Sequence, residues 1–503
     1  MEESLYNVLI TLIIFSKKFK INKKIKKDIL KTIQILSVAR VSDCSTTTHT
    51  QLFLLQTFLL KPNPFLRYCF VMGAPFVAHV LFLLCFFATT FSFFFKAESY
   101  VSCNEKDKQA LLNFKQGLSD PLKLLSSWSD QEDCSRWDGV VYDNKTGRVT
   151  ELHLNAASFN YSQLGGEIRG SLLQLEHLNY LDLSRNDFNC TLIPTFLGSM
   201  VSLTHLDLNW ANFSGHIPHQ LGNLSNLRYL GLGGNNYLYA DNFHWMSNLS
   251  SIQYLDLSDS KLLIEVGWLQ IMSMFPSLST LIVADCELGN LNPSLGFVNF
   301  TSLQHLDLSF NQLDNLNPTL GFVNFPSLRY LDLSNNPLDN PNPSLGFVNF
   351  TSLQYLDLSY SKLLKEVDWL QIMSMFPSLS MLIASDCELV NLNTSLGFVN
   401  FTSLQYLDLS DNLFSHEIPN WFSNLTTSLL HLDLSNNSLI GEIPPSIFNL
   451  PKLEYLDLSS NKLIGKIPES LGQLKHLTYL DMGGNFFSGP IPSSIGNLSY
   501  LEA

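Results

Sequence analysis

Charged residues are scarce in this 503-residue sequence, because Asp, Glu, Lys and Arg together make up only 15% of it. The short motifs that mark common catalytic and metal sites are also missing: no CxxC, HExxH, GxSxG or GxxxxGK[S/T] occurs. The 12 histidines are dispersed along the chain, so they do not suggest a metal site. These absences predict a protein that is not an enzyme and that needs no cofactor and no metal.

The net charge of -14 conceals an uneven distribution along the chain. Residues 1–71 carry eleven Lys and Arg against four acidic residues, so the remaining chain holds 19 basic and 40 acidic residues. Binding to nucleic acid requires a basic face. The acidic body of the chain therefore argues against nucleic acid as a partner.

An apolar run of twenty residues, 76–95, separates the basic N-terminal segment from the rest of the chain. Ala97 and Ser99 follow this run at the spacing of a signal-peptide cleavage site, and Met72 precedes it as a natural initiator. The pattern predicts a signal peptide at residues 72–99 and passage through the secretory pathway.

Residues 1–71 contain no repeat and no capping pattern, so we expect them to be a non-native or disordered extension. In the alternative interpretation, translation starts at Met1 and the apolar run is a membrane anchor, because twenty apolar residues can span a bilayer. N-terminal sequencing of the mature protein distinguishes the two interpretations.

Residues 100–148 differ from the sequence that follows them. Apolar residues recur at helical spacing until Asp120 and Pro121 end that pattern. Trp128 and Trp137 then supply bulk that can cover the open end of a hydrophobic core. We therefore expect an N-terminal cap that contains a helix.

From residue 149 to the end of the chain, a unit of the form LxLxxNxL recurs about fourteen times. After a first interval of 29 residues, the spacing lies between 24 and 26 residues, which is typical of leucine-rich repeats. Alternate residues of a strand point to opposite faces, so the leucines are expected to point inward and the residues between them outward. The pattern predicts an α/β-type repeat solenoid over residues 149–503, with short parallel strands on its concave face.

The position five residues after each strand leucine is Asn in eight repeats and Cys in two. We expect a structural role, because a buried amide can satisfy backbone groups that no strand partner reaches. Cys286 and Cys387 occupy the same position as an accepted alternative, with neither a metal nor a disulfide. The predicted ladder consists of Asn186, Asn235, Asn311, Asn336, Asn412, Asn437, Asn461 and Asn485.

Two segments in the middle of the solenoid are near copies of each other. Residues 258–309 match residues 359–410 at 43 of 52 positions. Such near-identity indicates recent internal duplication, so we interpret this middle region as scaffold more than as a tuned contact surface.

The residues that flank each strand leucine form an aromatic stripe and an acidic stripe on the predicted concave face. Such stripes suit peptide or glycan recognition, although the phrase YLDLS is also the ordinary repeat phrase. The residues that break the phrase are therefore more informative as ligand-binding candidates. They are Arg185, Trp210, Arg228, Phe310, Arg329 and Tyr360.

The sequence contains thirteen N-x-S/T sequons, which agree with passage through the secretory pathway. Three of them are copies of one FVNFTSL unit and count as a single observation. The predicted glycosylation sites include Asn144, Asn212, Asn299, Asn349, Asn400 and Asn424.

The motifs of the chain resemble those of plant extracellular leucine-rich repeats. The repeats contain GHIP, GEIP, GKIP and GPIP, which fit the pattern LxGxIP, and the segment NEKDKQALLNFKQGL resembles the plant N-terminal cap. The segment WLQIMSMFPSLSTLIVADCELGNL looks most like receptor-like proteins related to receptors for a fungal ethylene-inducing xylanase. The resemblance covers about residues 72–503.

The resemblance implies a cell-surface immune receptor without its own kinase, which binds a microbial or damage-derived protein, peptide or glycan and signals through co-receptor kinases. Family members usually have two further cap cysteines where this chain has Ser135 and Tyr142. If those two are lost together, Cys103 and Cys134 can still form the other disulfide.

The sequence stops at Ala503, where the next strand of the pattern should begin. We expect a truncated receptor, extracellular in this form and attached to the plasma membrane only if the full-length form has a C-terminal helix. The alternative function is a secreted inhibitor of microbial cell-wall-degrading enzymes, similar to polygalacturonase-inhibiting proteins.

Overall fold

The computed structural model describes residues 101–502, apart from several internal segments. The predicted extension and signal peptide lie outside the described residues. The internal segments that are not described are 157–162, 263–267, 290–297, 314–322, 339–349, 363–368, 393–400, 421 and 423–427.

A 15-stranded sheet runs through the described body, and its strands follow one another in sequence order. The strand β2 (Val140–Tyr142) is antiparallel to its neighbour, whereas all later neighbours in this sheet are parallel. The parallel strands are β3 (Val149–His153), β5 (Tyr180–Asp182), β7 (His205–Asp207), β9 (Tyr229–Gly231), β11 (Tyr254–Asp256), β13 (Thr280–Ile282), β15 (His305–Asp307), β17 (Tyr330–Asp332), β18 (Tyr355–Asp357), β19 (Met381–Ile383), β20 (Tyr406–Asp408), β21 (His431–Asp433), β22 (Tyr455–Asp457) and β24 (Tyr479–Asp481).

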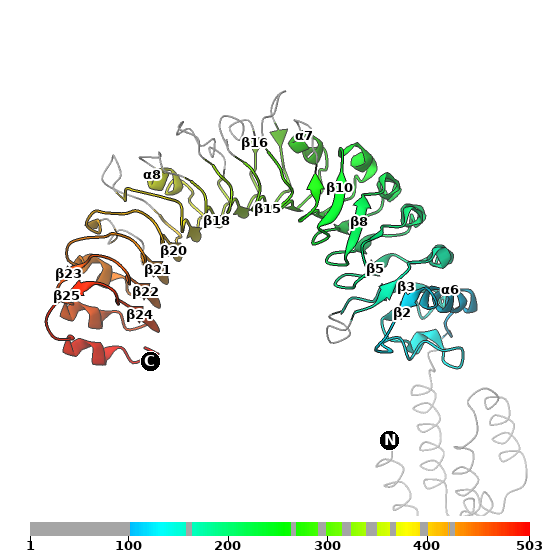
Figure 1. Cartoon of the computed structure of the whole chain (residues 1–503), viewed down its shortest axis with the longest axis horizontal. Coiled ribbons are helices and arrows are strands. Elements are labelled where there is room, and N and C mark those ends of the chain that lie inside the picture. The colour runs from blue at the N-terminus through cyan, green and yellow to red at the C-terminus, as the bar shows by residue number, and fades with distance from the viewer. Residues whose placement is uncertain are drawn as a thin grey trace, which may run out of the picture. The chain divides into compact units, whose positions relative to one another are not determined.

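The register of the sheet pairs equivalent residues of neighbouring repeats, so Leu181 lies opposite Leu206 and Leu206 opposite Leu230. These leucines are fully buried. Burying such a side chain stabilises by about 1.5 to 3 kcal/mol, and each repeat needs its neighbours to achieve it. The predicted solenoid is therefore confirmed, with one strand for each predicted repeat, and its strands line the inner side of the curve (Figure 1).

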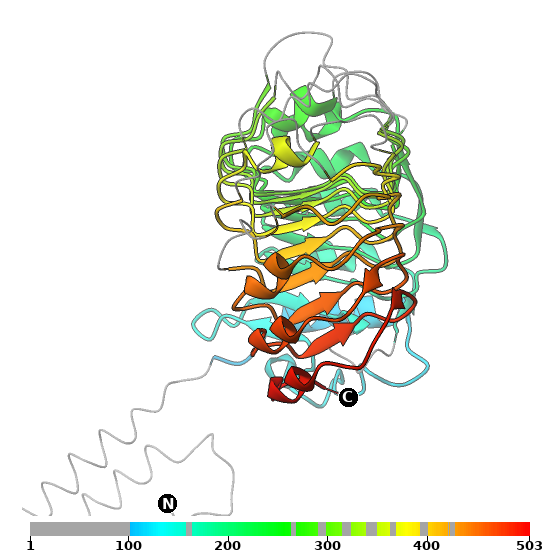
Figure 2. The ribbon, with the colours of Figure 1, turned by 90° about the vertical axis from the view of Figure 1, so that its left-hand side faces the viewer.

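The outer side of the solenoid is built from short helices and a second set of strands. Figure 2 shows the repeats stacked one upon another with these helices along one flank. A four-stranded parallel sheet has the order β12-β10-β8-β6, and the pairs β14-β16 and β23-β25 are also parallel. These strands are β6 (Thr191–Leu192), β8 (Phe213–His216), β10 (Tyr237–Ala240), β12 (Lys261–Leu262), β14 (Val298–Asn299), β16 (Val323–Asn324), β23 (Ile464–Gly465) and β25 (Phe486–Phe487).

Most of the helices on this side are single turns of 3-10 type. Two α-helices, α7 (Trp268–Ser273) and α8 (Trp369–Met373), occupy equivalent places in the two copied segments. The 3-10 helices of the repeats are η3 (Gly170–Gln174), η4 (Thr195–Ser199), η5 (His219–Asn223), η6 (His244–Asn248), η9 (Pro445–Asn449), η10 (Glu469–Gln473) and η11 (Ser493–Asn497).

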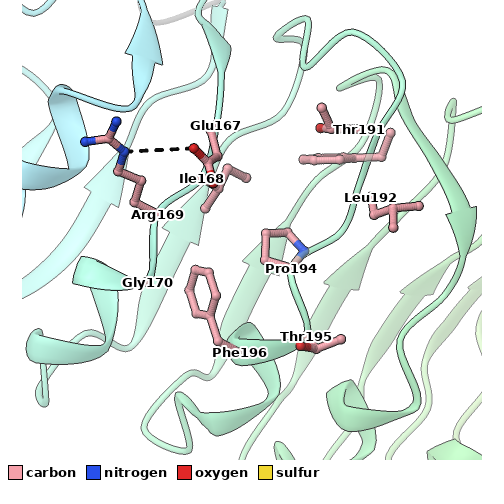
Figure 3. Close-up of a pocket in the computed structure, with 10 residues that line it drawn as sticks. Glu167, Ile168, Arg169, Gly170, Thr191, Leu192, Pro194, Thr195 and Phe196 are labelled. Carbon is pink, nitrogen blue, oxygen red and sulfur yellow. Dashed lines mark ion pairs between the residues drawn. The ribbon is translucent and has the colours of Figure 1, made fainter.

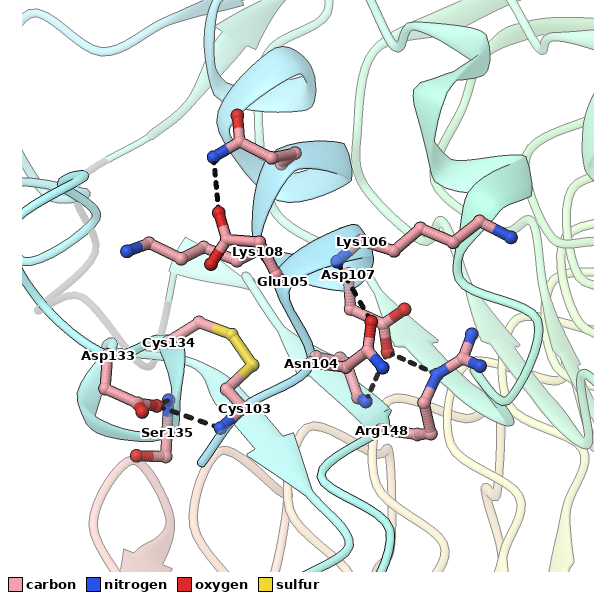
Figure 4. The surroundings of a disulfide bond; sticks show 12 residues. Cys103, Asn104, Glu105, Lys106, Asp107, Lys108, Asp133, Cys134, Ser135 and Arg148 are labelled. Carbon is pink, nitrogen blue, oxygen red and sulfur yellow. Dashed lines mark hydrogen bonds and ion pairs between the residues drawn. A yellow bond between two sulfur atoms is a disulfide. The ribbon is translucent and has the colours of Figure 1, made fainter. Parts of the chain in front are cut away.

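The cap begins with α6 (Glu105–Lys115), whose first turn is capped by the side chain of Asn104. The short strand β1 (Leu118–Ser119) pairs with β4 (Gly165–Gly166), and η1 (Cys134–Arg136) follows. Cys103 and Cys134 form a disulfide with their Cα atoms 5.5 Å apart (Figure 4). The two predicted cap tryptophans are buried and stacked, with ring centroids 5.3 Å apart.

A buried ion pair joins this cap to the first repeat. The Asp107 carboxylate accepts hydrogen bonds from Arg148 Nε at 3.0 Å and from the backbone N–H of Val149 at 2.9 Å (Figure 4). Asp107 is fully buried, so removing Arg148 would leave a buried carboxylate without its ion-pair partner. The cap is therefore attached to the solenoid by a specific polar contact as well as by apolar packing.

Within the described residues, no helix combines the length and the apolar character that crossing a membrane requires.

Candidate recognition face

The strand face carries a ladder of stacked aromatic rings along its length. The ring centroids of neighbouring repeats lie 3.9 to 4.4 Å apart, which is van der Waals contact. Thr280 and Met381 stand in the ladder positions of β13 and β19, so they interrupt it. The three resulting runs are His153 to Tyr254, His305 to Tyr355, and Tyr406 to Tyr479.

The aspartates of the acidic stripe beside the rings form hydrogen bonds within the fold. One carboxylate oxygen of each strand aspartate accepts the backbone N–H of the residue two positions on, at 2.7 to 3.0 Å. In five repeats the other oxygen accepts a tyrosine hydroxyl at 3.2 to 3.5 Å. The geometry thus favours the structural interpretation of the phrase YLDLS.

Burial shifts the pKa values of the aspartates and the histidines of this face in opposite directions. It raises the pKa of Asp207 and Asp332 to about 6 each. It also lowers the pKa of His205 and His431 to about 4 each. Burial therefore favours the neutral form of both kinds of group: the aspartates take up a proton near pH 6, whereas the histidines stay neutral until the pH falls to about 4.

From β5 onward, the residue four positions after each strand leucine has a left-handed backbone, and we call this set the turn column. Its φ values lie between 50° and 69° from Arg185 to Gly484. Most of its members are Gly, Asn, Asp or Ser, and the first three tolerate this conformation best. The exceptions are Arg185, Trp210, Phe310 and Tyr360.

The six predicted ligand-binding residues separate into two groups. The four exceptions just named belong to the turn column, after the strands. Arg228 and Arg329 instead lie two residues before their strand leucines, at the opposite end of the strands. All six are exposed, but the structure does not bring the two arginines next to the turn-column residues.

The three aromatic exceptions expose large apolar surface. Trp210, Phe310 and Tyr360 have exposed fractions of 57%, 58% and 59%. The ring of Trp210 lies over Gly234, where a Cβ atom would collide with it. The side chain of Trp210 therefore extends along the turn column toward the next repeat.

The sequence prediction missed the acidic residues of the same column. Asp259, Asp285, Asp386 and Asp411 lie at the turn-column position of their repeats. Burial raises the pKa of Asp259 and Asp411, and repulsion from Asp285 and Asp386, respectively, adds to the effect. Their common spacing of four residues from a strand leucine is the signal that would have identified them.

The Asn ladder lies behind this face and links each repeat to the one before it. The amide of Asn186 donates to the carbonyls of Leu154 and Leu183 at 2.7 and 2.8 Å, and its oxygen accepts the N–H of Leu164 at 2.8 Å. The amides of the other predicted ladder residues donate in the same way to a carbonyl of the previous repeat.

The two cysteines of the ladder position are buried thiols. The Cys286 Sγ donates to the carbonyl of Leu257 at 3.2 Å, and the Cys387 Sγ donates to that of Leu358 at 3.0 Å. Burial raises the pKa of both thiols, to about 12 for Cys387. These thiols therefore replace the amide of the ladder at its position.

Three of the predicted glycosylation sites lie on the described surface. Asn144 is exposed in the turn before β3. The Asn212 amide donates to Asp187 at 2.7 Å, and the Asn299 oxygen accepts the Asn324 amide at 3.0 Å. Asn349, Asn400 and Asn424 lie outside the described residues.

A shallow pocket of about 470 Å³ lies on the outer side, away from the predicted ligand-binding residues. Pro194 and Phe196 are among the residues that line it, as are Glu167 and Arg169, which form an ion pair at 4.0 Å (Figure 3). Near this pocket, β4 pairs with β1 of the cap, and β6 is an edge strand of the four-stranded outer sheet.

Comparisons with known families match the repeats and the cap. The family described as "Leucine-rich repeat region" matches residues 159–367, and "Leucine rich repeat" matches residues 427–487 and 403–425. The "Leucine rich repeat N-terminal domain" matches residues 104–141.

Among curated proteins, the chain is 39% identical over 217 residues to Receptor-like protein EIX1 of Solanum lycopersicum. This match covers 41% of the chain but only 21% of that protein. Among solved structures, PEPR1-AtPEP1 has a TM-score of 0.56 at 26% identity, covering 79% of this chain and 58% of that one. The plant peptide hormone receptor RGFR1 in complex with RGF2 has a TM-score of 0.51 at 25% identity, covering 73% and 55%.

Proposed function

We propose that this chain, which belongs to the plant leucine-rich-repeat receptor-like proteins, uses its strand face to recognise a microbial or damage-derived ligand in defence signalling. The supporting observation is the turn column. Three large aromatic side chains there are more than half exposed, in a left-handed conformation that disfavours them. Exposed rings give contact area at low cost in conformational entropy.

The comparisons support a protein or peptide as the class of ligand. RGFR1, which has a similar fold, is described as a peptide hormone receptor. Because the chain spans about a fifth of the curated relative it matches, signalling through partner kinases at the cell surface is part of the same proposal.

Binding measurements on the full chain test this function. The probes are a fungal ethylene-inducing xylanase, a fungal polygalacturonase and an array of synthetic peptides. We expect at least one probe to bind, and to lose roughly tenfold or more in affinity when Trp210, Phe310 and Tyr360 are changed together to Asn. Asn is the matched choice because the turn column already holds it at Asn335 and Asn436.

The control replaces Asp130 and Glu132, which are exposed acids of the cap, with their amides. Binding that survives the triple substitution would contradict the proposed face. Inhibition of polygalacturonase hydrolysis by the chain would instead indicate the secreted-inhibitor function.

A further inference from the structure

In the middle of the turn column, two aromatic residues lie between two pairs of acidic residues. Asp259 and Asp285 form the first acid pair, Phe310 and Tyr360 are the two central rings with Asn335 between them, and Asp386 and Asp411 form the second acid pair. Backbone hydrogen bonds of 2.8 to 3.1 Å connect each of these positions to the adjacent repeat. Their order along the solenoid is therefore also their order in space.

The length of this segment corresponds to a short extended peptide. Seven consecutive strands, from β11 to β20, present these positions. At about 4.8 Å between neighbouring strands, the two ends are about 29 Å apart. An extended chain rises about 3.3 Å per residue, so about nine residues would span the segment.

In the part of the chain that the structure describes, no ion pair within 4.0 Å involves the four carboxylates of the acid pairs. Asp285, Asp386 and Asp411 are exposed. Burial and repulsion from neighbouring acids raise the pKa of Asp259 and Asp411, although each of these two carboxylates also accepts a hydrogen bond, from the Gly234 backbone and the Asn436 side chain respectively. The exposed carboxylates of Asp285 and Asp386 therefore differ from those of the strand aspartates, which accept backbone and hydroxyl donors.

The two central rings lie between these charges. Phe310 and Tyr360 are 58% and 59% exposed, so each offers apolar surface to a ligand. A left-handed backbone disfavours a bulky side chain, and nothing in the described packing requires a ring at either position. A partner with basic groups at both ends and an apolar centre would therefore complement this surface.

The geometry points to an extended peptide segment of about nine residues, with basic side chains near both ends and apolar side chains between them, as the ligand of this part of the turn column. The basic ends would face the two acid pairs and the apolar centre would contact the two central rings. This inference rests on the proposed function and specifies the chemistry of the ligand that the strand face takes.

The test uses the full chain and three synthetic nonapeptides with the same apolar centre. Their ends carry two Lys residues, two Gln residues or two Glu residues on each side. We expect the Lys peptide to bind at least tenfold more tightly than the other two, and its affinity to fall as salt is raised.

Two variants locate the binding. Asp285→Asn with Asp386→Asn removes charge while keeping a residue that tolerates the left-handed backbone, and should lower the affinity for the Lys peptide roughly tenfold. Phe310→Asn with Tyr360→Asn should lower the affinity for all peptides that bind. The cap variant, Asp130→Asn with Glu132→Gln, serves as the matched charge control.

The outcomes distinguish a failure of this inference from a failure of the proposed function on which it rests. Suppose that the Gln or Glu peptide binds as tightly as the Lys peptide, and that the Phe310 and Tyr360 variant abolishes this binding. The inference that the ligand has basic ends is then wrong, whereas the proposed recognition face is supported. If neither variant alters any binding, both proposals are wrong.

Discussion

The two copied segments, 258–309 and 359–410, share a core but differ on the strand face. Six of their nine differences fall on described residues, and four of these six lie on the strand face or in the turn column. The four pairs are Asp259 and Tyr360, Thr280 and Met381, Ala284 and Ser385, and His305 and Tyr406. The copies have therefore changed mainly where a ligand could contact them, which argues against interpreting the middle as scaffold alone.

The buried half of each copy is nearly unchanged because repeats share their cores with their neighbours. Among the differences at described residues, only the pair Val283 and Ala384 lies in the buried core. A change of volume in one repeat also alters the packing of the repeats above and below it. Outward residues meet no such restriction.

The largest effect is expected from the shared core. Leu281→Ala and Leu382→Ala remove fully buried side chains that lie between leucines of both neighbours. Each should lower the free energy of unfolding by about 2 to 5 kcal/mol. Urea denaturation followed by circular dichroism measures both losses. A difference above about 1 kcal/mol between the two variants would show that the cores are not equivalent.

A smaller loss is expected when the ladder amide is removed from each copy. Asn311→Leu and Asn412→Leu leave buried N–H and carbonyl groups without partners, at about 1 to 3 kcal/mol per group. The same denaturation assay measures the loss. Asn311→Cys should be milder, because Cys286 occupies the equivalent position with a thiol that donates to a carbonyl. Equal losses for Cys and Leu would refute the hydrogen-bonding role.

Exchanging the turn-column residues of the two copies should have opposite effects of about 1 kcal/mol. Tyr360→Asp should stabilise the chain, because Asp tolerates the left-handed backbone better than Tyr, and Asp259→Tyr should destabilise it. Thermal unfolding of both variants measures the sign. If Tyr360→Asp is destabilising, the Tyr360 ring contributes packing that its exposure does not reveal.

The smallest effect concerns pH. Burial lowers the pKa of His305 below its ordinary value of 6.5, whereas Tyr406 in the other copy has its pKa raised to about 12. Below pH 6.5 the unfolded chain binds a proton at His305 more readily than the folded chain does. Stability is therefore lost as the pH falls through this range.

His305→Tyr should reduce this acid-induced loss, and Tyr406→His should increase it. Melting temperatures at pH 7 and pH 5 for both variants and the unaltered chain measure the difference. The same loss in all three proteins would mean that these ring positions do not contribute to the pH dependence.

Much of the fold followed from spacing alone. The interval between leucines predicts the strand of each repeat and its register, because equivalent residues must stack for the core to close. The outer sheet from β6 to β12 was not predicted, since its two- to four-residue strands have no pattern of their own. The contact between Asp107 and Arg148 also joins residues 41 positions apart and leaves no local signal.

The candidate site was predicted in part. Exceptions to the phrase YLDLS identified Trp210, Phe310 and Tyr360, which the structure leaves exposed. The same reasoning grouped them with Arg228 and Arg329, although these lie at the other end of the strands. The repeat sequence shows only where residues lie along the chain. Whether they form one surface depends on which of them face outward together and which are already hydrogen-bonded within the fold.

The sequence by itself determined the number of repeats, the inward leucines and the positions of the amide ladder, because each depends on a period that the chain repeats at every turn. Only the tertiary structure decided which acidic residues remain exposed. The strand aspartates form hydrogen bonds to neighbouring donors within the fold, while Asp285 and Asp386 of the turn column stay exposed to solvent. That distinction arises from the stacking of repeats, which places different donors beside chemically identical carboxylates.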